Sequence, residues 1–80
     1  MEALRSENKI SLNLTREEAI VLFEFVTSLN KREDLSLFQD QSEERVFWDI
    51  EASLESVMDE IFDKNYIDIL LNSRIKLRDL

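Results

Sequence analysis

The absence of both glycine and proline is the feature that most restricts what this chain of 80 residues can fold into. Glycine supplies the positive φ angles of tight turns in β-sandwiches and barrels, and glycine-rich loops cradle nucleotide phosphates. Helices joined by connectors of Asn, Asp and Ser need neither residue. The sequence therefore predicts an all-α fold, and it excludes a nucleotide site built on a glycine loop.

Cysteine and histidine are also absent, which narrows the chemistry available to the chain. Disulfides are impossible, zinc sites of the usual kind lack their ligands, and most nucleophile–base arrangements cannot be built. A pair of carboxylates could act as acid and base, but it needs a cleft, and a bundle of three short helices leaves little room for one. We therefore expect a non-catalytic protein with no metal and no cofactor.

The length indicates one domain over residues 1–80, and a domain this small has thin stability. The hydrophobic fraction of 44% is enough for a core and excludes a disordered acidic tail. The opening residues, MEALRSENK, are polar and unlike a signal peptide, and no apolar run approaches the roughly 20 residues of a membrane span. We expect a cytoplasmic protein that does not contact a membrane.

The first fourteen residues are predicted to be an extended arm. Residues 1–8 are expected to be loose, whereas apolar and polar residues alternate over 9–14, which is the periodicity of a strand. We expect this segment to pack on the core as a single extended strand. The alternatives are a short β-ribbon in which it pairs with residues 35–38, and a strand pair formed with another molecule.

A capping box marks the start of the first helix. The Thr15 hydroxyl and the Glu18 carboxylate can each accept a hydrogen bond from the other residue's backbone N–H. The helix is predicted over about 16–30. Its apolar positions are Ala19, Ile20, Val21, Leu22, Phe23, Phe25, Val26 and Leu29. So wide an apolar surface predicts a central helix that is covered on more than one side.

Two further helices are predicted after a charged connector at 30–34. Asp40 or Ser42 should cap a helix over about 41–62. The sequence does not decide whether this helix is separate from the last one or continuous with it through a bend. Its apolar seam is Phe47, Ile50, Leu54, Val57 and Ile61, at coiled-coil-like spacing. Asn65 and Asp68 resemble a weaker capping box for a helix over about 66–79. That helix is expected to bury Ile67, Leu70, Leu71, Ile75 and Leu77.

The acidity of the chain is confined to one segment. Between positions 40 and 63 lie nine acidic residues and a single basic one, Arg45, so this segment alone accounts for the net charge of −8. The other residues hold nine acids and nine bases, which cancel. Successive residues of a helix are about 100° apart, and at this spacing one row of side chains runs beside the apolar seam of the second helix. The members of this row are Glu44, Trp48, Glu51, Glu55 and Asp59.

This row predicts the partner-binding surface. A concentrated negative field speeds encounter with a positive surface, and tryptophan is a common anchor of protein interfaces. The alternative is a solvated helix face that keeps the protein soluble, with Trp48 buried under the arm. Direct nucleic-acid binding is disfavoured because phosphate contacts need Lys and Arg. The acidic helix could instead mimic nucleic acid and fill the basic groove of a nuclease.

Two resemblances bear on function. Residues 12–26, LNLTREEAIVLFEFV, resemble the opening of small uncharacterised bacterial proteins in which an extended segment enters a helix through Leu-Thr-x-x-Glu-Ala. In size, acidity and helical pattern the chain is similar to bacterial immunity proteins, which neutralise nuclease or other toxins of competing strains. That resemblance implies an inhibitor of a basic toxin domain. The alternative is a homodimeric structural or adaptor protein, because the apolar faces exceed what three helices bury.

Overall fold

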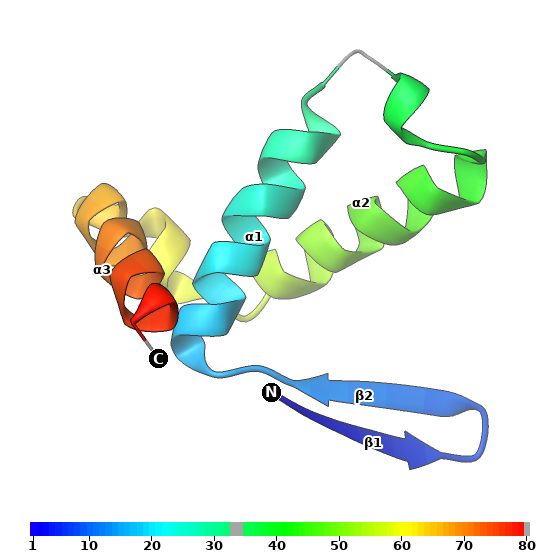
Figure 1. Ribbon diagram of the computed structural model, residues 1–80, viewed down its shortest axis with the longest axis horizontal. Coiled ribbons are helices and arrows are strands. Elements are labelled where there is room, and N and C mark those ends of the chain that lie inside the picture. The colour runs from blue at the N-terminus through cyan, green and yellow to red at the C-terminus, as the bar shows by residue number, and fades with distance from the viewer. Residues whose placement is uncertain (33–34, 80) are drawn as a thin grey trace.

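The computed structural model describes residues 1–32 and 35–79, and within them a β-hairpin precedes three packed helices (Figure 1). The hairpin strands are β1 (Glu2–Ser6) and β2 (Lys9–Asn13), and the helices are α1 (Arg16–Asn30), α2 (Gln41–Glu55) and α3 (Tyr66–Arg78). Short 3₁₀ helices cover Leu35–Leu37 and Asp59–Phe62. The predicted helical fold with an extended N-terminal arm is confirmed. Glu33 and Asp34 of the predicted charged connector lie outside the described residues.

Helix α1 is the centre of the molecule. The predicted capping box begins it, with Thr15 N donating to Glu18 Oε1 at 2.9 Å and Glu18 N donating to Thr15 Oγ1 at 3.1 Å. The helix packs against α2 on one side and α3 on the other, as Figure 1 shows. Ile20 and Val26 are completely buried. The wide apolar surface predicted for this helix is therefore used on both sides.

Helix α2 ends seven residues earlier than the sequence predicts. Asp40 caps it by accepting a hydrogen bond from Ser42 N at 2.9 Å, but the helix stops at Glu55 rather than at Phe62. The chain leaves the helix at Ser56, and Met58 enters the core beside Ile20. The predicted seam breaks at this point, and Val57 is left 77% exposed.

Helix α3 is a separate element whose buried face differs from the prediction. Asn65 makes no side-chain cap, and Asp63 Oδ1 instead accepts a hydrogen bond from Asn65 N at 2.8 Å. The buried residues of α3 are Leu70 and Ser73, whereas the predicted core residues Ile67, Leu71 and Ile75 are exposed. Ser73 tolerates burial because its hydroxyl donates to Ile69 O at 2.8 Å.

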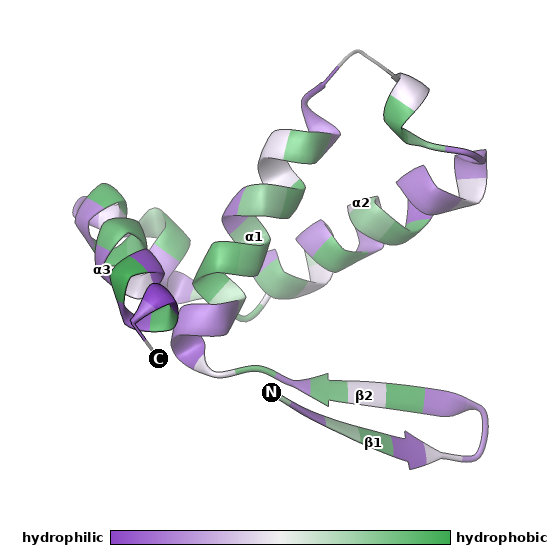
Figure 2. Cartoon of the chain, in the orientation of Figure 1, coloured by the Kyte–Doolittle hydropathy of each residue, from purple (hydrophilic) through white to green (hydrophobic). Residues whose placement is uncertain are grey.

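The N-terminal arm is a hairpin, not a single strand. Residues 2–6 pair with 9–13 in antiparallel register, so the expectation of a loose segment at 1–8 is wrong, as is the alternative that 35–38 supply the second strand. Every residue of both strands is exposed, so the arm does not pack on the core as predicted. Figures 1 and 2 show it extending away from the helices, with apolar residues along its length.

The hairpin turn is strained because the chain has no glycine to place there. Glu7 and Asn8 connect the strands, and Glu7 has a φ of 54°, in the left-handed region. A side chain in that region costs roughly 1–2 kcal/mol. Two strands without further cover are themselves only marginally stable. The hairpin is thus the least secured element of the fold.

Candidate protein-binding site

Four of the five predicted site residues lie together on one side of α2, beside the face that packs against α1. They form what we call the acidic ridge: Glu44, Trp48, Glu51 and Glu55. Asp59, the fifth predicted residue, lies on the 3₁₀ helix after α2, because α2 ends at Glu55. The ridge therefore spans one side of a single helix and ends where that helix ends.

Trp48 is an exposed side chain in the middle of this ridge. It is 51% exposed, so the alternative that the arm buries it is wrong. Together with Glu51, Ala52 and Glu55 it lines a shallow hollow of about 210 Å³. Ala52 leaves space beside the indole because its side chain is a single methyl group. An apolar ring next to a hollow, framed by two carboxylates, can take up a long cationic side chain such as arginine.

The carboxylates of the ridge are not neutralised by cations from other parts of the described chain. Glu44 and Glu55 make no hydrogen bond or ion pair within residues 1–32 and 35–79. Glu51 accepts a hydrogen bond from Asn30 Nδ2 at 2.7 Å, which is a contact with a neutral amide. Arg45, the single base between positions 40 and 63, forms no ion pair with any described residue. The negative charge of the ridge is consequently open to an outside partner.

Asn30 has a role that its position in the predicted connector did not reveal. Its Nδ2 donates to Phe47 O at 3.2 Å and to Glu51 Oε1 at 2.7 Å, so the last residue of α1 is joined to the middle of α2. Both contacts are half-buried. They hold the Glu51 carboxylate in place at the edge of the ridge. A helix-terminal asparagine gives no sequence signal for a contact across 21 positions.

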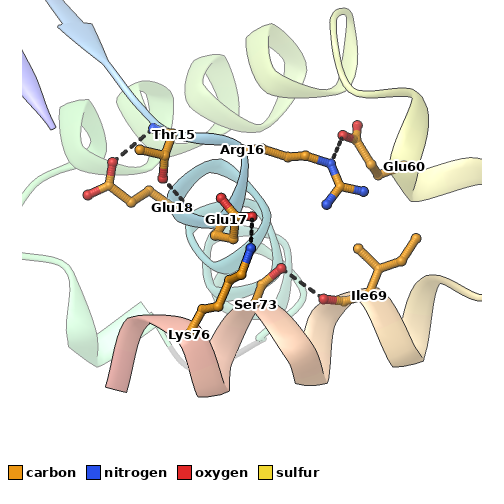
Figure 3. A network of polar contacts seen from close by, with 8 residues as sticks. All are labelled: Thr15, Arg16, Glu17, Glu18, Glu60, Ile69, Ser73 and Lys76. Carbon is orange, nitrogen blue, oxygen red and sulfur yellow. Dashed lines mark hydrogen bonds and ion pairs between the residues drawn. The ribbon is translucent and has the colours of Figure 1, made fainter. Parts of the chain in front are cut away.

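The ion pairs that the described residues form gather around the start of α1. Arg16 Nε lies 2.8 Å from Glu60 Oε2, and Lys76 Nζ lies 3.1 Å from Glu17 Oε1 (Figure 3). The pKa of Glu17 is lowered by a hydrogen bond from its own backbone N–H and by Lys76. These exposed pairs attach α1 to the segments that follow α2, and each contributes little stability. They leave the acidic ridge untouched.

Other carboxylates of the acidic segment serve the fold. The pKa of Asp40 is lowered by hydrogen bonds from the Ser42 side chain and backbone, and that of Glu60 by its own backbone N–H and Arg16. Glu43 Oε1 accepts from Gln39 N at 3.2 Å. Capping and pairing therefore account for these residues. They do not account for Glu44 and Glu55.

The remaining polar groups of the described residues are not arranged as a catalytic or metal site. Within the described residues, no cluster of three or more acidic side chains is placed to hold a metal ion. Tyr66 donates to Glu24 Oε2 at 2.8 Å, and desolvation together with this hydrogen bond raises the pKa of Tyr66 above its ordinary value. This contact joins α3 to α1 and leaves the phenol a poor acid. None of the helices in the described ranges is long and apolar enough to cross a bilayer.

The acidic ridge presents an exposed indole among carboxylates that no cation of the described chain neutralises. Comparison with family models, with curated proteins and with solved structures finds no match to this chain.

Proposed function

We propose that the protein is a non-catalytic binding module that occludes a basic protein partner, and that this partner is a nuclease-type toxin. One observation carries the proposal. Trp48 is half exposed at the centre of a helix face on which Glu44 and Glu55 have no cationic partner within the described chain. A protein that needed only solubility would gain nothing from an exposed indole at that position.

The expected mechanism is steric and electrostatic. Glu44, Glu51 and Glu55 offer acceptor-only oxygens to Lys and Arg side chains, and carboxylate pairs with Arg are bidentate and strong. The field of the ridge speeds encounter with a basic surface and rejects acidic proteins. Trp48 would fill a pocket of the partner and exclude water around these pairs. A toxin whose basic groove binds nucleic acid would then be blocked by the helix that occupies it.

The cost that the ridge imposes on the free protein supports this proposal. Glu51 and Glu55 are four residues apart on one helix, and such a like-charge pair destabilises the helix by roughly 0.2–0.5 kcal/mol. No lysine or arginine of α2 lies between them to relieve it. A basic partner would remove this repulsion on binding, so the complex would regain the free energy that the repulsion costs the isolated helix.

The proposal is tested by capture from the cells that express the protein, with three baits in parallel. The baits are the wild type, Glu44→Lys with Glu55→Lys, and Asp68→Lys with Asp79→Lys as the control. Both double variants change the net charge by the same amount, but Asp68 and Asp79 lie on α3 and its C-cap, away from the ridge. We expect the wild type and the control to retain a protein rich in Lys and Arg, and the ridge variant to lose it.

Two results would count against the proposal. One is that all three baits retain the same proteins, because the ridge would then be irrelevant to binding. The other is that both double variants lose the partner equally, which would show a response to net charge alone. Circular dichroism of each bait checks that helix content is unchanged, so that a loss of binding is not a loss of fold.

A further inference from the structure

An open apolar groove lies between the hairpin and α2. It has a volume of about 470 Å³, and one wall is formed by β2 while the other is formed by α2. The side chains that make it apolar are Ile10, Leu12, Leu14, Leu22, Val46, Ile50 and Leu54. Three of them are largely exposed, at 67% for Ile10, 58% for Leu12 and 55% for Val46. The groove is therefore a hydrophobic surface that the described part of the chain leaves uncovered.

The register of the hairpin directs its apolar residues to this groove. Ile10 stands opposite Arg5, and Leu12 stands opposite Ala3, so these four side chains share one face of the two-stranded sheet. The opposite face carries Leu4 among polar residues. Ile10 and Leu12 line the groove, so their face of the hairpin is the one turned to α2. One face thus has the pattern of a buried surface and the other that of a solvated one.

The hairpin has too little support within its own chain to explain this pattern. No residue of either strand is buried, and the strained turn at Glu7 opposes its formation. Two strands with no further cover are marginal in water. An apolar strand face that stays formed under these conditions needs a surface to cover it.

We propose that the groove is covered by a second copy of this chain, in a symmetric dimer in which each hairpin packs into the groove of the other. Charge favours this occupant. The hairpin carries two acids and two bases, Glu2, Glu7, Arg5 and Lys9, so it is the part of an acidic chain that can approach another copy without repulsion. Arg5 and Lys9 form no ion pair among the described residues, and the groove holds one carboxylate, Asp49.

Symmetry agrees with this choice. A two-fold interface uses the same surface on both subunits and closes on itself. The second copy therefore covers both hairpins at once and leaves no apolar groove open.

Dimer formation would leave the acidic ridge free. At about 100° per residue, Val46 and Ile50 lie on one flank of α2 and Trp48 and Glu55 on the opposite flank. The two surfaces can be occupied together, so the dimer would present two ridges. The dimer does not depend on the proposed inhibitor role, and each can fail without the other.

Sedimentation velocity at about 100 μM tests the dimer with four proteins: the wild type, Ile10→Lys, Val46→Lys and, as the matched control, Leu4→Lys. All three positions are exposed in the single chain, and Leu4 lies on the hairpin face turned away from the groove. We expect the wild type and Leu4→Lys to sediment at twice the 9.5 kDa mass of the chain. Ile10→Lys and Val46→Lys should raise the dimer dissociation constant by at least tenfold.

A wild type that remains monomeric at this concentration overturns the proposal, and so does a dimer that Leu4→Lys weakens as much as Ile10→Lys does. Val46→Lys separates a lost interface from a lost hairpin, because Val46 lies on α2 and its substitution leaves the strands intact. A dimer that survives both Ile10→Lys and Val46→Lys would show that the copies meet elsewhere, which also refutes this interface.

Discussion

Truncating Trp48 to alanine is expected to weaken binding to the basic partner by about 30-fold to 700-fold, which corresponds to the 2–4 kcal/mol of an interface hot spot. The indole is 51% exposed in the free protein and lies between carboxylates, so its removal deletes partner contacts rather than core contacts. The free energy of unfolding should fall by less than about 1 kcal/mol. Isothermal titration calorimetry measures the first effect, and urea unfolding measures the second.

The matched control for this substitution is Phe62→Ala. Phe62 is an aromatic side chain with 75% exposure, but it lies on the 3₁₀ helix beyond α2 and outside the acidic ridge. Its truncation should leave the affinity within about threefold of the wild type. Equal losses of affinity for the two variants would mean that exposed aromatic surface in general, and not the ridge, supports binding.

Replacing Ile20 by alanine is expected to lower the free energy of unfolding by about 3–4 kcal/mol. Ile20 is completely buried and belongs to the core cluster with Phe23, Met58 and Leu70. The cavity would open where α1 meets both α3 and the segment after α2. A domain of this length has a total stability of only about 4–12 kcal/mol, so the variant should be close to unfolding at 37 °C. Urea unfolding followed by circular dichroism measures the loss.

Phe25→Ala is the control on the same helix. Phe25 is 60% exposed, so Phe25→Ala should lower the free energy of unfolding by about 1 kcal/mol or less, although it removes more atoms than Ile20→Ala does. If the urea midpoints of Ile20→Ala and Phe25→Ala fell equally, the face of α1 that includes Ile20 would not be the centre of the core.

Helix α1 could be predicted almost to the residue because its signals are local. The capping box at Thr15 and Glu18 fixes the start, and the wide apolar surface indicates a helix covered on two sides. Both features depend on side chains within a few positions of each other. They do not depend on what the rest of the chain does.

The end of α2 could not be predicted, because it is decided by packing between distant segments. The apolar spacing through Val57 and Ile61 favours a continuous helix, yet the helix ends at Glu55 and Met58 packs beside Ile20 in the core. The same limit explains α3. Its exposed Ile67, Leu71 and Ile75 follow a helical spacing as regular as that of a core face, and the side that meets α1 includes a serine.

The hairpin was missed for a different reason. A two-residue turn is normally signalled by glycine or asparagine at the position with positive φ, and here that position holds Glu7. Residues 2–6 also mix charged, polar and apolar types without a clear alternation. The alternation over 9–13 identified one strand, but its partner gave no signal of its own.

The acidic row was predicted in large part because four of its members lie on one helix, where spacings of three and four residues determine the face. Asp59 does not continue the row on α2, because the helix ends before it. The contact from Asn30 to Glu51 and the groove beside β2 could not be foreseen, since both depend on how α1, α2 and the hairpin are placed relative to one another.

The central claim is that a basic partner covers the acidic ridge, and the single tryptophan of the chain allows the most direct test. In protein labelled with ¹⁵N, the indole N–H of Trp48 gives one isolated signal, and an unlabelled partner contributes none. On addition of the captured basic protein, we predict that this signal shifts or broadens along with the backbone amides of Glu51 and Glu55. A complex that forms while the Trp48 signal stays unchanged would contradict the account.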